Sequence, residues 1–278
     1  MDSVLMKLGN LDRRVLYVIL FLAVLYPLVN PIGLPFKISE WTLNFYKAVE
    51  NCKPGDVILV AMDYSVGGGP DVHPQAEAVF KHAMERGLKV VLAAFVIEGQ
   101  EFGNQLVALG ERMGKVYGED FVNLGFAPGV EVAISSFAQD VLGVFATDVR
   151  GNQTASLPIM KGIKTAGDFV LICDFATGIP GPAEWIRQVQ TRYNVPIASG
   201  VVTVMGPQTE PYYQSGQLVG LLSGLRSAAE YELAMQQPGM AVAGMDAQSM
   251  GHVAIVVFVV LGNLVYFVEK KKKPGGRR

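Results

Sequence analysis

The chain contains few residues of the types that usually carry chemistry, with two cysteines and three histidines among its 278 residues. Two cysteines cannot build a disulfide-rich scaffold or a multi-cysteine metal site, so both classes are excluded. A disulfide between Cys52 and Cys173 stays open if the protein lies outside the cytoplasm. The formal net charge of −2 leaves no electrostatic footprint for nucleic acid. We therefore predict no metal site, no cofactor and no nucleic-acid partner.

Charge is also missing from two apolar segments, one near each end of the chain. Val15–Val29 and Met250–Val268 contain no Asp, Glu, Lys or Arg. Each is close to the roughly 20 residues that a helix needs to cross a bilayer. We expect residues 1–34 to form an N-terminal cytoplasmic segment and transmembrane anchor. Residues 35–246 would form a soluble domain, and residues 247–278 a second transmembrane helix with a basic tail.

Flanking charge predicts the orientation of these two spans in the cell membrane. Lys7, Arg13 and Arg14 precede the first span, and the tail Lys270–Arg278 (KKKKPGGRR) follows the second. Because Lys and Arg beside a span stay in the cytoplasm, we expect both termini to be cytoplasmic and the domain to be extracytoplasmic. A cleaved signal peptide is the alternative, but the first span is followed by no small-x-small cleavage site. Membrane lipid is therefore an expected partner.

Between the spans, short apolar runs alternate with stretches of helical spacing, which is typical of βαβ units around a mainly parallel sheet. The expected strands are Val57–Met62, Val90–Phe95, Phe121–Leu124, Phe169–Cys173 and Ile197–Met205. The expected helices are Pro74–Arg86, Phe102–Tyr117, Val132–Phe145, Ala183–Tyr193 and Tyr212–Met235. About five strands with intervening helices predict a Rossmann-like or flavodoxin-like α/β fold. Residues 146–165 fit neither period and are a candidate lid or assembly loop.

A weak internal repeat locates the expected site. Gly55–Tyr64 resembles Gly167–Phe175, and each is followed by a Gly-rich turn that ends in Gly-Pro. If these two strands open the two halves of a doubly wound sheet, they are neighbours where the strand order reverses, and ligands bind beyond their carboxyl ends. The predicted ligand-binding residues follow these two strands: Asp63, Tyr64, Ser65, Gly67, Gly68, Asp174, Thr177 and Gly178.

The chemistry of this expected site has several interpretations. The two aspartates could share Mg²⁺ or Ca²⁺, could divide into acid and base, or could only cap turns. Gly67–Gly69 could approach an anion, although the loop matches neither GxGxxG nor a Walker motif. His73 could act as base for Ser65 in a hydrolase that also uses Asp63 and Asp174, but the chain has no GxSxG elbow.

Small residues recur every four positions in the last expected helix, at Gly216, Gly220, Gly224 and Ala228. Each internal glycine destabilises a helix by roughly 1 kcal/mol relative to alanine, so something should pack close to this face. One interpretation is packing on the domain's own sheet. The other is a contact between helices of two subunits, which would make the protein a homo-oligomer or bind it to another membrane protein.

Three stretches carry a resemblance that covers most of the chain. Tyr212–Glu232, Gly244–Phe267 and Pro54–Tyr64 resemble an uncharacterised family of prokaryotic membrane-anchored α/β proteins, which implies this architecture but no established activity. Asp56–Gly110 is similar to the ClpP and signal-peptide-peptidase superfamily of serine proteases, without a serine at an expected nucleophile position. We expect a non-enzymatic, membrane-tethered module for assembly, scaffolding or ligand sensing. The alternative is a membrane-bound hydrolase, serine-protease-like or metal-assisted, with its site at Asp63 and Asp174.

Overall fold

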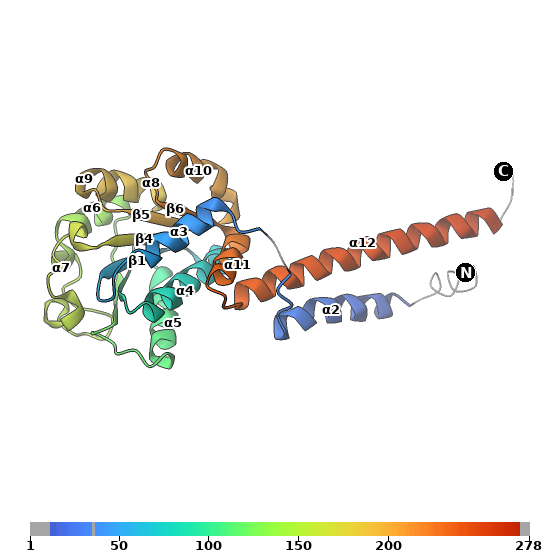
Figure 1. Ribbon diagram of the computed structural model, residues 1–278, viewed down its shortest axis with the longest axis horizontal. Helices are drawn as coiled ribbons and strands as arrows, with labels where there is room; N and C mark the ends of the chain where they lie inside the picture. Colours follow the sequence, from blue (N-terminus) through green and yellow to red (C-terminus); the bar gives the residue numbers. More distant parts are fainter. Residues whose placement is uncertain (1–11, 35–36, 273–278) are drawn as a thin grey trace. The chain divides into compact units, whose positions relative to one another are not determined.

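The computed structural model describes residues 12–34 and 37–272, which divide into two compact units (Figure 1). The larger unit comprises residues 37–237. The smaller unit comprises residues 12–34 together with residues 238–272. Lys7 and the end of the basic tail, residues 273–278, lie outside the described residues.

The larger unit is an α/β fold around one parallel sheet of six strands, in the order β3-β2-β1-β4-β5-β6. The strands are β1 (Val57–Asp63), β2 (Lys89–Ala94), β3 (Phe121–Phe126), β4 (Leu171–Ala176), β5 (Ile197–Val201) and β6 (Gly220–Ser223). The helices are α3 (Glu40–Glu50), α4 (Gly69–Glu85), α5 (Gly99–Arg112), α6 (Glu131–Gln139), α7 (Val141–Val144), α8 (Pro182–Trp185), α9 (Thr191–Tyr193), α10 (Gly206–Gln214) and α11 (Gly224–Ala234), with a π-helical stretch, η5 (Ile186–Gln190), between α8 and α9. The mainly parallel α/β prediction is confirmed, but the expectation of about five strands is wrong because the sheet has six.

The strands are continuous apolar runs because helices cover both faces of the sheet. In β1, Ile58, Val60 and Met62 point into a core that includes side chains of α3, α4, α5 and α11. Leu59 and Ala61 point to the other face, into a core that includes side chains of α6 and α8. Both cores are buried, so the sheet is a packed base for the loops at the two ends of its strands. We call these two ends of the sheet the amino edge and the carboxyl edge.

The strand order places the switch point of the sheet between β1 and β4. The chain winds outward from β1 to β3 on one side, and from β4 to β6 on the other, which is the doubly wound Rossmann order. Ala61 of β1 pairs in register with Asp174 of β4. The prediction that these two strands are neighbours is therefore confirmed. Their carboxyl ends open onto the crevice where such sheets bind ligands.

The helix expected over Tyr212–Met235 is wrong. Its first residues belong to α10, its middle forms β6, and only its end forms α11. Gly216 lies in a turn at φ +78°, and Gly224 lies at φ +70° where α11 begins. Both angles favour glycine, because an L side chain is strained there.

The stripe of Gly216, Gly220, Gly224 and Ala228 therefore does not exist on one helix, and it gives no support to a subunit interface. Gly220 has a different role. It is the first residue of β6, where a Cβ would meet the Phe45 backbone of α3. Glycine here lets α3 pack directly on the edge strand.

Residues 146–165 are anchored to the larger unit rather than arranged as a lid. Ile159 and Met160 are buried in the core that α6 and α8 share. The buried Asp148 carboxylate accepts backbone N–H bonds from Arg150 (2.9 Å) and Asn152 (2.8 Å). The segment lacks regular periodicity because side-chain capping and short 3₁₀ turns hold it, such as η2 (Thr154–Ser156) and η3 (Pro158–Met160).

The smaller unit contains α2 (Arg13–Val29) and α12 (Met240–Lys272). In the described part of the chain one helical segment, Met240–Val268, is long and apolar enough to cross a membrane. The expected N-terminal span is not among such segments, since α2 has 17 residues and ends shortly after Pro27. It measures about 26 Å at 1.5 Å per residue.

The two helices of the smaller unit lie side by side (Figure 1). Val24 lies 3.5 Å from the position of a Cβ on Gly251, so glycine allows a close approach. The buried Asp246 carboxylate accepts backbone N–H bonds from Ile32 (2.7 Å) and Gly33 (2.8 Å). Its other oxygen, Oδ1, accepts the Leu34 N–H (3.0 Å). These bonds fasten the segment after α2 to α12.

Candidate functional site

Two loops meet beyond the carboxyl ends of β1 and β4. The Ser65 N–H donates to Thr177 Oγ1 (2.9 Å), and the Thr177 hydroxyl donates to Ser65 Oγ (3.3 Å). The Thr177 N–H donates to the Asp63 carbonyl oxygen (3.3 Å). The structure thus brings Ser65 and Thr177, both expected ligand-binding residues, into direct contact at the switch point.

The three expected glycines of these loops have different surroundings. A Cβ on Gly68 would overlap the Thr177 side chain and lie 3.0 Å from Val202 Cγ1, so glycine is required for loop packing there. Gly178 has open space around its Cα, and the nearest atom to a Cβ on Gly67 would be Ser65 Oγ at 3.9 Å. The backbone at Gly67 and Gly178 is therefore accessible to a bound molecule.

A cavity of about 410 Å³ lies at the carboxyl ends of β4 and β5. Its lining comes from the loop after β4, from α8, from the turn before α10 and from α10 itself: Thr177, Gly178, Ile179, Pro182, Ala183, Glu184, Met205, Gln208, Thr209 and Tyr212. Among these described residues there is no Lys or Arg. The lining thus combines hydroxyl and amide groups with one carboxylate, and it offers no cation for a phosphate.

Asp63 lies below this crevice, fully buried on the face of the sheet that α8 covers. Its Oδ1 accepts the Phe95 backbone N–H (2.7 Å), and its Oδ2 accepts the Trp185 indole N–H (2.9 Å). Burial raises the pKa of Asp63 to about 7, although both hydrogen bonds act in the opposite direction. This carboxylate ties β1 to the end of β2 and to α8, and it is not in the cavity lining.

Asp174 is also fully buried, on the same face as Asp63. Its Oδ2 accepts the Ser199 hydroxyl (2.8 Å), while its Oδ1 has no hydrogen-bond partner among the described residues. Burial raises the pKa of Asp174 well above its usual value, and the nearby Asp63 carboxylate raises it further. The two aspartates are thus a buried pair whose ionised forms burial disfavours, rather than exposed ligands.

Tyr64 and His73 lie on the opposite face of the sheet from Asp63. The Tyr64 hydroxyl and His73 Nδ1 are 2.9 Å apart, and the Phe102 ring packs against both rings. Burial lowers the pKa of His73. Because His73 pairs with a tyrosine and faces away from the aspartates, the structure does not bring Asp63, Ser65, His73 and Asp174 together as hydrolase chemistry needs.

Metal-assisted chemistry also has no assembled site in the described residues. No group of three or more His, Cys, Asp or Glu side chains within residues 12–34 and 37–272 is arranged to hold a metal ion. Glu184 is the acidic side chain nearest to the cavity, and its carboxylate is already engaged by the Gly181 N–H (3.0 Å) and by Arg187 (2.6 Å).

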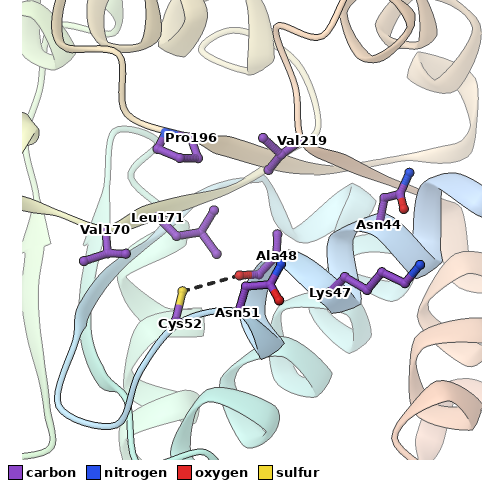
Figure 2. Close-up of a pocket in the computed structure, with 9 residues that line it drawn as sticks. All are labelled: Asn44, Lys47, Ala48, Asn51, Cys52, Val170, Leu171, Pro196 and Val219. Atoms are coloured by element: carbon purple, nitrogen blue, oxygen red, sulfur yellow. Dashed lines mark hydrogen bonds between the residues drawn. The ribbon is translucent and has the colours of Figure 1, made fainter.

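A second cavity, of about 420 Å³, lies at the opposite edge of the sheet (Figure 2). Its lining comes from α3 and from the residues where β4, β5 and β6 begin: Asn44, Lys47, Ala48, Asn51, Cys52, Val170, Leu171, Pro196 and Val219. The Cys52 thiol donates to the Ala48 carbonyl oxygen (3.4 Å). Cys52 and Cys173 are both free and buried, so the disulfide that the sequence left open is not formed.

The sequence prediction missed the cavity residues that follow β5. The expected strand Ile197–Met205 continued too far, since β5 ends at Val201 and the turn η6 (Thr203–Met205) leads into α10. A signal was present in the chain. Gly206-Pro207 opens α10 just as Gly69-Pro70 opens α4 and Gly181-Pro182 opens α8. Proline is favoured in the first turn of a helix, so this third Gly-Pro pair marks a helix start beside the site.

No protein-family model matches this chain, and no curated protein matches it. The function must therefore be argued from the fold and the geometry of the two edges of the sheet.

Proposed function

We propose that the protein is a membrane-tethered binding module, without catalytic activity of its own, that takes a small ligand at the carboxyl edge of its sheet. The observation that carries this proposal is the cavity of about 410 Å³ beside the switch point, where the Gly178 backbone is open. Parallel sheets of this order bind ligands at that position.

The lining indicates the class of ligand. Thr177, Gln208, Thr209 and Tyr212 supply hydroxyl and amide groups, and Glu184 supplies the one carboxylate. Since no Lys or Arg lines the cavity, a nucleotide or another phosphate compound would lack a partner for its charge. The Glu184 carboxylate is already paired with Arg187 (2.6 Å), so it leaves no free charge for a cation. The ligand is a small polar molecule without a phosphate group.

Blocking the cavity tests this proposal. Gly178 lines the cavity, and a Cβ placed there meets no atom within 4 Å, so Gly178→Leu adds bulk at the lining without displacing the backbone. The matched control is Val219→Phe, which narrows the cavity at the amino edge. We expect thermal-shift screening with polyols, amino acids and small amines to find compounds that stabilise the wild type and Val219→Phe but not Gly178→Leu. Equal stabilisation of all three proteins, or stabilisation by ATP, NAD or inorganic phosphate, contradicts the proposal.

The tether is proposed to have two spans, with both termini in the cytoplasm. The side chains that α2 exposes include Val18, Phe21 and Leu25, and its interior carries no charge. Because α2 packs along α12, a membrane that contains α12 would also cover this apolar surface. The larger unit lies between the two spans in the sequence. If both termini are in the cytoplasm, it therefore lies outside the cytoplasm.

Cysteine labelling in whole cells tests the topology. In a background with Cys52→Ala and Cys173→Ala, a membrane-impermeant thiol reagent should label Asn152→Cys and leave Gly276→Cys unlabelled. The reverse labelling pattern contradicts the proposed orientation. It would place the carboxyl edge of the sheet in the cytoplasm, where nucleotides are abundant. Labelling at both positions contradicts the two-span topology.

A further inference from the structure

Exposed aliphatic side chains in the larger unit concentrate at one edge of the sheet. Among residues 37–237 the five most exposed large hydrophobic side chains are Val66 (66%), Ile97 (67%), Val132 (73%), Ile179 (75%) and Val204 (85%). They follow β1, β2, β3, β4 and β5 respectively. Four lie in the connections after their strands, and Val132 is in the first turn of α6. We call these five residues the carboxyl-edge row.

Contacts between the loops hold this row together. The loops after β1 and β4 join through Ser65 and Thr177. The loop after β5 joins α4 where Thr203 donates from its N–H (3.1 Å) and its hydroxyl (2.9 Å) to Asp71 Oδ2. Since neighbouring strands lie about 4.8 Å apart, the five strand ends that precede these residues span roughly 20 Å.

The other edge of the sheet has no comparable surface. Val116, Val170 and Val219 precede β3, β4 and β6, and they are less exposed, at 51%, 43% and 37%. At the carboxyl edge even the backbone is unusual. Val130 lies at φ +52°, a region that β-branched residues rarely enter, and strain of this kind gathers at functional surfaces. Exposed apolar side chains that gather at one end of a sheet with polar residues around them are typical of interaction sites.

Charge in the connections that follow β1 to β5 is of one sign. Arg226, which follows β6, is exposed and is paired with Glu230 (3.1 Å). The segments 63–71, 95–101, 126–132, 176–184 and 202–210 contain no Lys or Arg. Arg187, the nearest cation in α8–η5, is neutralised by Glu131 (3.0 Å) and Glu184 (2.6 Å). Glu98, Glu101 and Glu210 lie at the rim without a Lys or Arg partner within salt-bridge distance among the described residues.

We propose that the carboxyl-edge row docks a protein partner whose contact surface is apolar and rimmed by Lys and Arg. Charge complementarity selects this occupant, because an anionic lipid surface would be repelled by the same acidic rim. The inference deepens the proposed binding function by naming a partner class. The docking proposal rests on the proposed function only in that the larger unit is a binding module. It does not depend on the small-ligand site.

A defined peptide probe tests the docking surface on the full chain in nanodiscs of zwitterionic lipid. The probe is an amphipathic peptide of leucine and lysine, and its control has glutamate in place of lysine. We expect fluorescence anisotropy to show binding of the lysine probe only. The triple variant Val66→Ser, Ile179→Ser and Val204→Ser should weaken it at least about tenfold.

The matched control is the triple variant Val116→Ser, Val170→Ser and Val219→Ser, which removes exposed aliphatic side chains from elsewhere and should bind as the wild type does. Equal loss in both triple variants, no loss in either, or binding of the glutamate peptide overturns the inference. Gly178→Leu should still bind the lysine probe. Gly178→Leu should therefore lose the small ligand and keep the lysine probe, so each of the two proposals can fail without the other.

The occupant in cells is identified by a photoreactive amino acid placed at Val204, with a second placed at Val219 as the control. We expect an adduct at Val204, absent at Val219, that mass spectrometry maps to a Lys- and Arg-containing segment of a different protein. An adduct with a second copy of this chain, with lipid, or with a segment that lacks Lys and Arg overturns the inference.

Discussion

The two edges of the sheet carry cavities of nearly equal size, about 420 Å³ at the amino edge and about 410 Å³ at the carboxyl edge. Volume therefore does not distinguish a functional edge from a structural one. The amino-edge cavity lies under α3 and beside Lys47, where the strands only begin. The carboxyl-edge cavity lies where loops can vary without disturbing the sheet, and where strand and helix ends direct unpaired backbone groups toward a ligand.

The two edges also use glycine in opposite ways. Gly220 at the start of β6 has the Phe45 backbone where a side chain would be, so α3 packs directly on that strand. Gly178 at the carboxyl edge has no atom within 4 Å of a Cβ position. The first glycine permits packing, and the second leaves space. Equivalent substitutions at these two positions should therefore separate structure from binding.

The largest expected effect is that of Gly220→Leu, because the new side chain must displace the α3 backbone. We expect a loss of about 3 kcal/mol or more in the free energy of unfolding, since backbone cannot yield as a flexible side chain does. Gly178→Leu should change it by less than about 1 kcal/mol. Thermal unfolding followed by circular dichroism measures both. If Gly220→Leu is as stable as Gly178→Leu, α3 does not pack on β6 as described.

The next effect concerns the two aspartates below the carboxyl edge. Asp63→Asn turns an amide NH₂ toward one of two donors, the Phe95 N–H or the Trp185 indole N–H, so one buried donor loses its acceptor. We expect a loss of about 2 kcal/mol. Asp174→Asn keeps an acceptor for Ser199 and replaces a carboxyl group whose ionised form burial disfavours, so it should be neutral within about 1 kcal/mol. Equal losses in the two variants would show that Asp63 and Asp174 have equivalent roles.

The same pair predicts how stability depends on pH. Because burial raises both pKa values above 3.8, the folded protein binds more protons than the unfolded chain above pH 4. Stability is then greatest below pH 4 for this pair and falls as pH rises toward about 7, the pKa of Asp63. Asp174 contributes to the decline in the same direction. Urea unfolding at several pH values should show a shallower decline in Asp174→Asn than in the wild type, and a stability that rises across this window contradicts the assignment.

The sequence predicted the pairing of β1 with β4 but not the direction in which their aspartates point. The repeat at Gly55–Tyr64 and Gly167–Phe175 correctly predicted that β1 and β4 are neighbours, because local strand patterns survive in the fold. It could not show that Asp63 and Asp174 turn into the core. The side of a strand that a residue faces depends on which helices cover it, and this is a tertiary property.

The missed strand β6 illustrates the opposite case. Its four residues, Gly220–Ser223, are too short for a reliable alternation, and the four-residue spacing of small residues around them imitated a helix. Gly220 is small because α3 packs on it, and Gly224 because its backbone is left-handed. Two unrelated local requirements thus produced one apparent period. The carboxyl-edge row was unpredictable for a related reason, since five separate loops become one surface only through the strand order.

The smallest expected effect is on the alkylation rate of Cys52, which tests whether a small reagent reaches the amino-edge cavity. Cys52 lines it and is 5% exposed, while Cys173 is fully buried in the adjacent core. Burial raises the pKa of the Cys52 thiol and raises that of Cys173 further, so little thiolate forms at pH 8. We expect a small alkylating reagent to modify Cys52 at least about tenfold more slowly than a free thiol, and Cys173 only after unfolding. Mass spectrometry of the alkylated peptides measures both rates, with Cys52→Ala as the control. Rapid modification of Cys52 in the folded protein would show that α3 opens, and the amino edge would then compete with the carboxyl edge as a binding site.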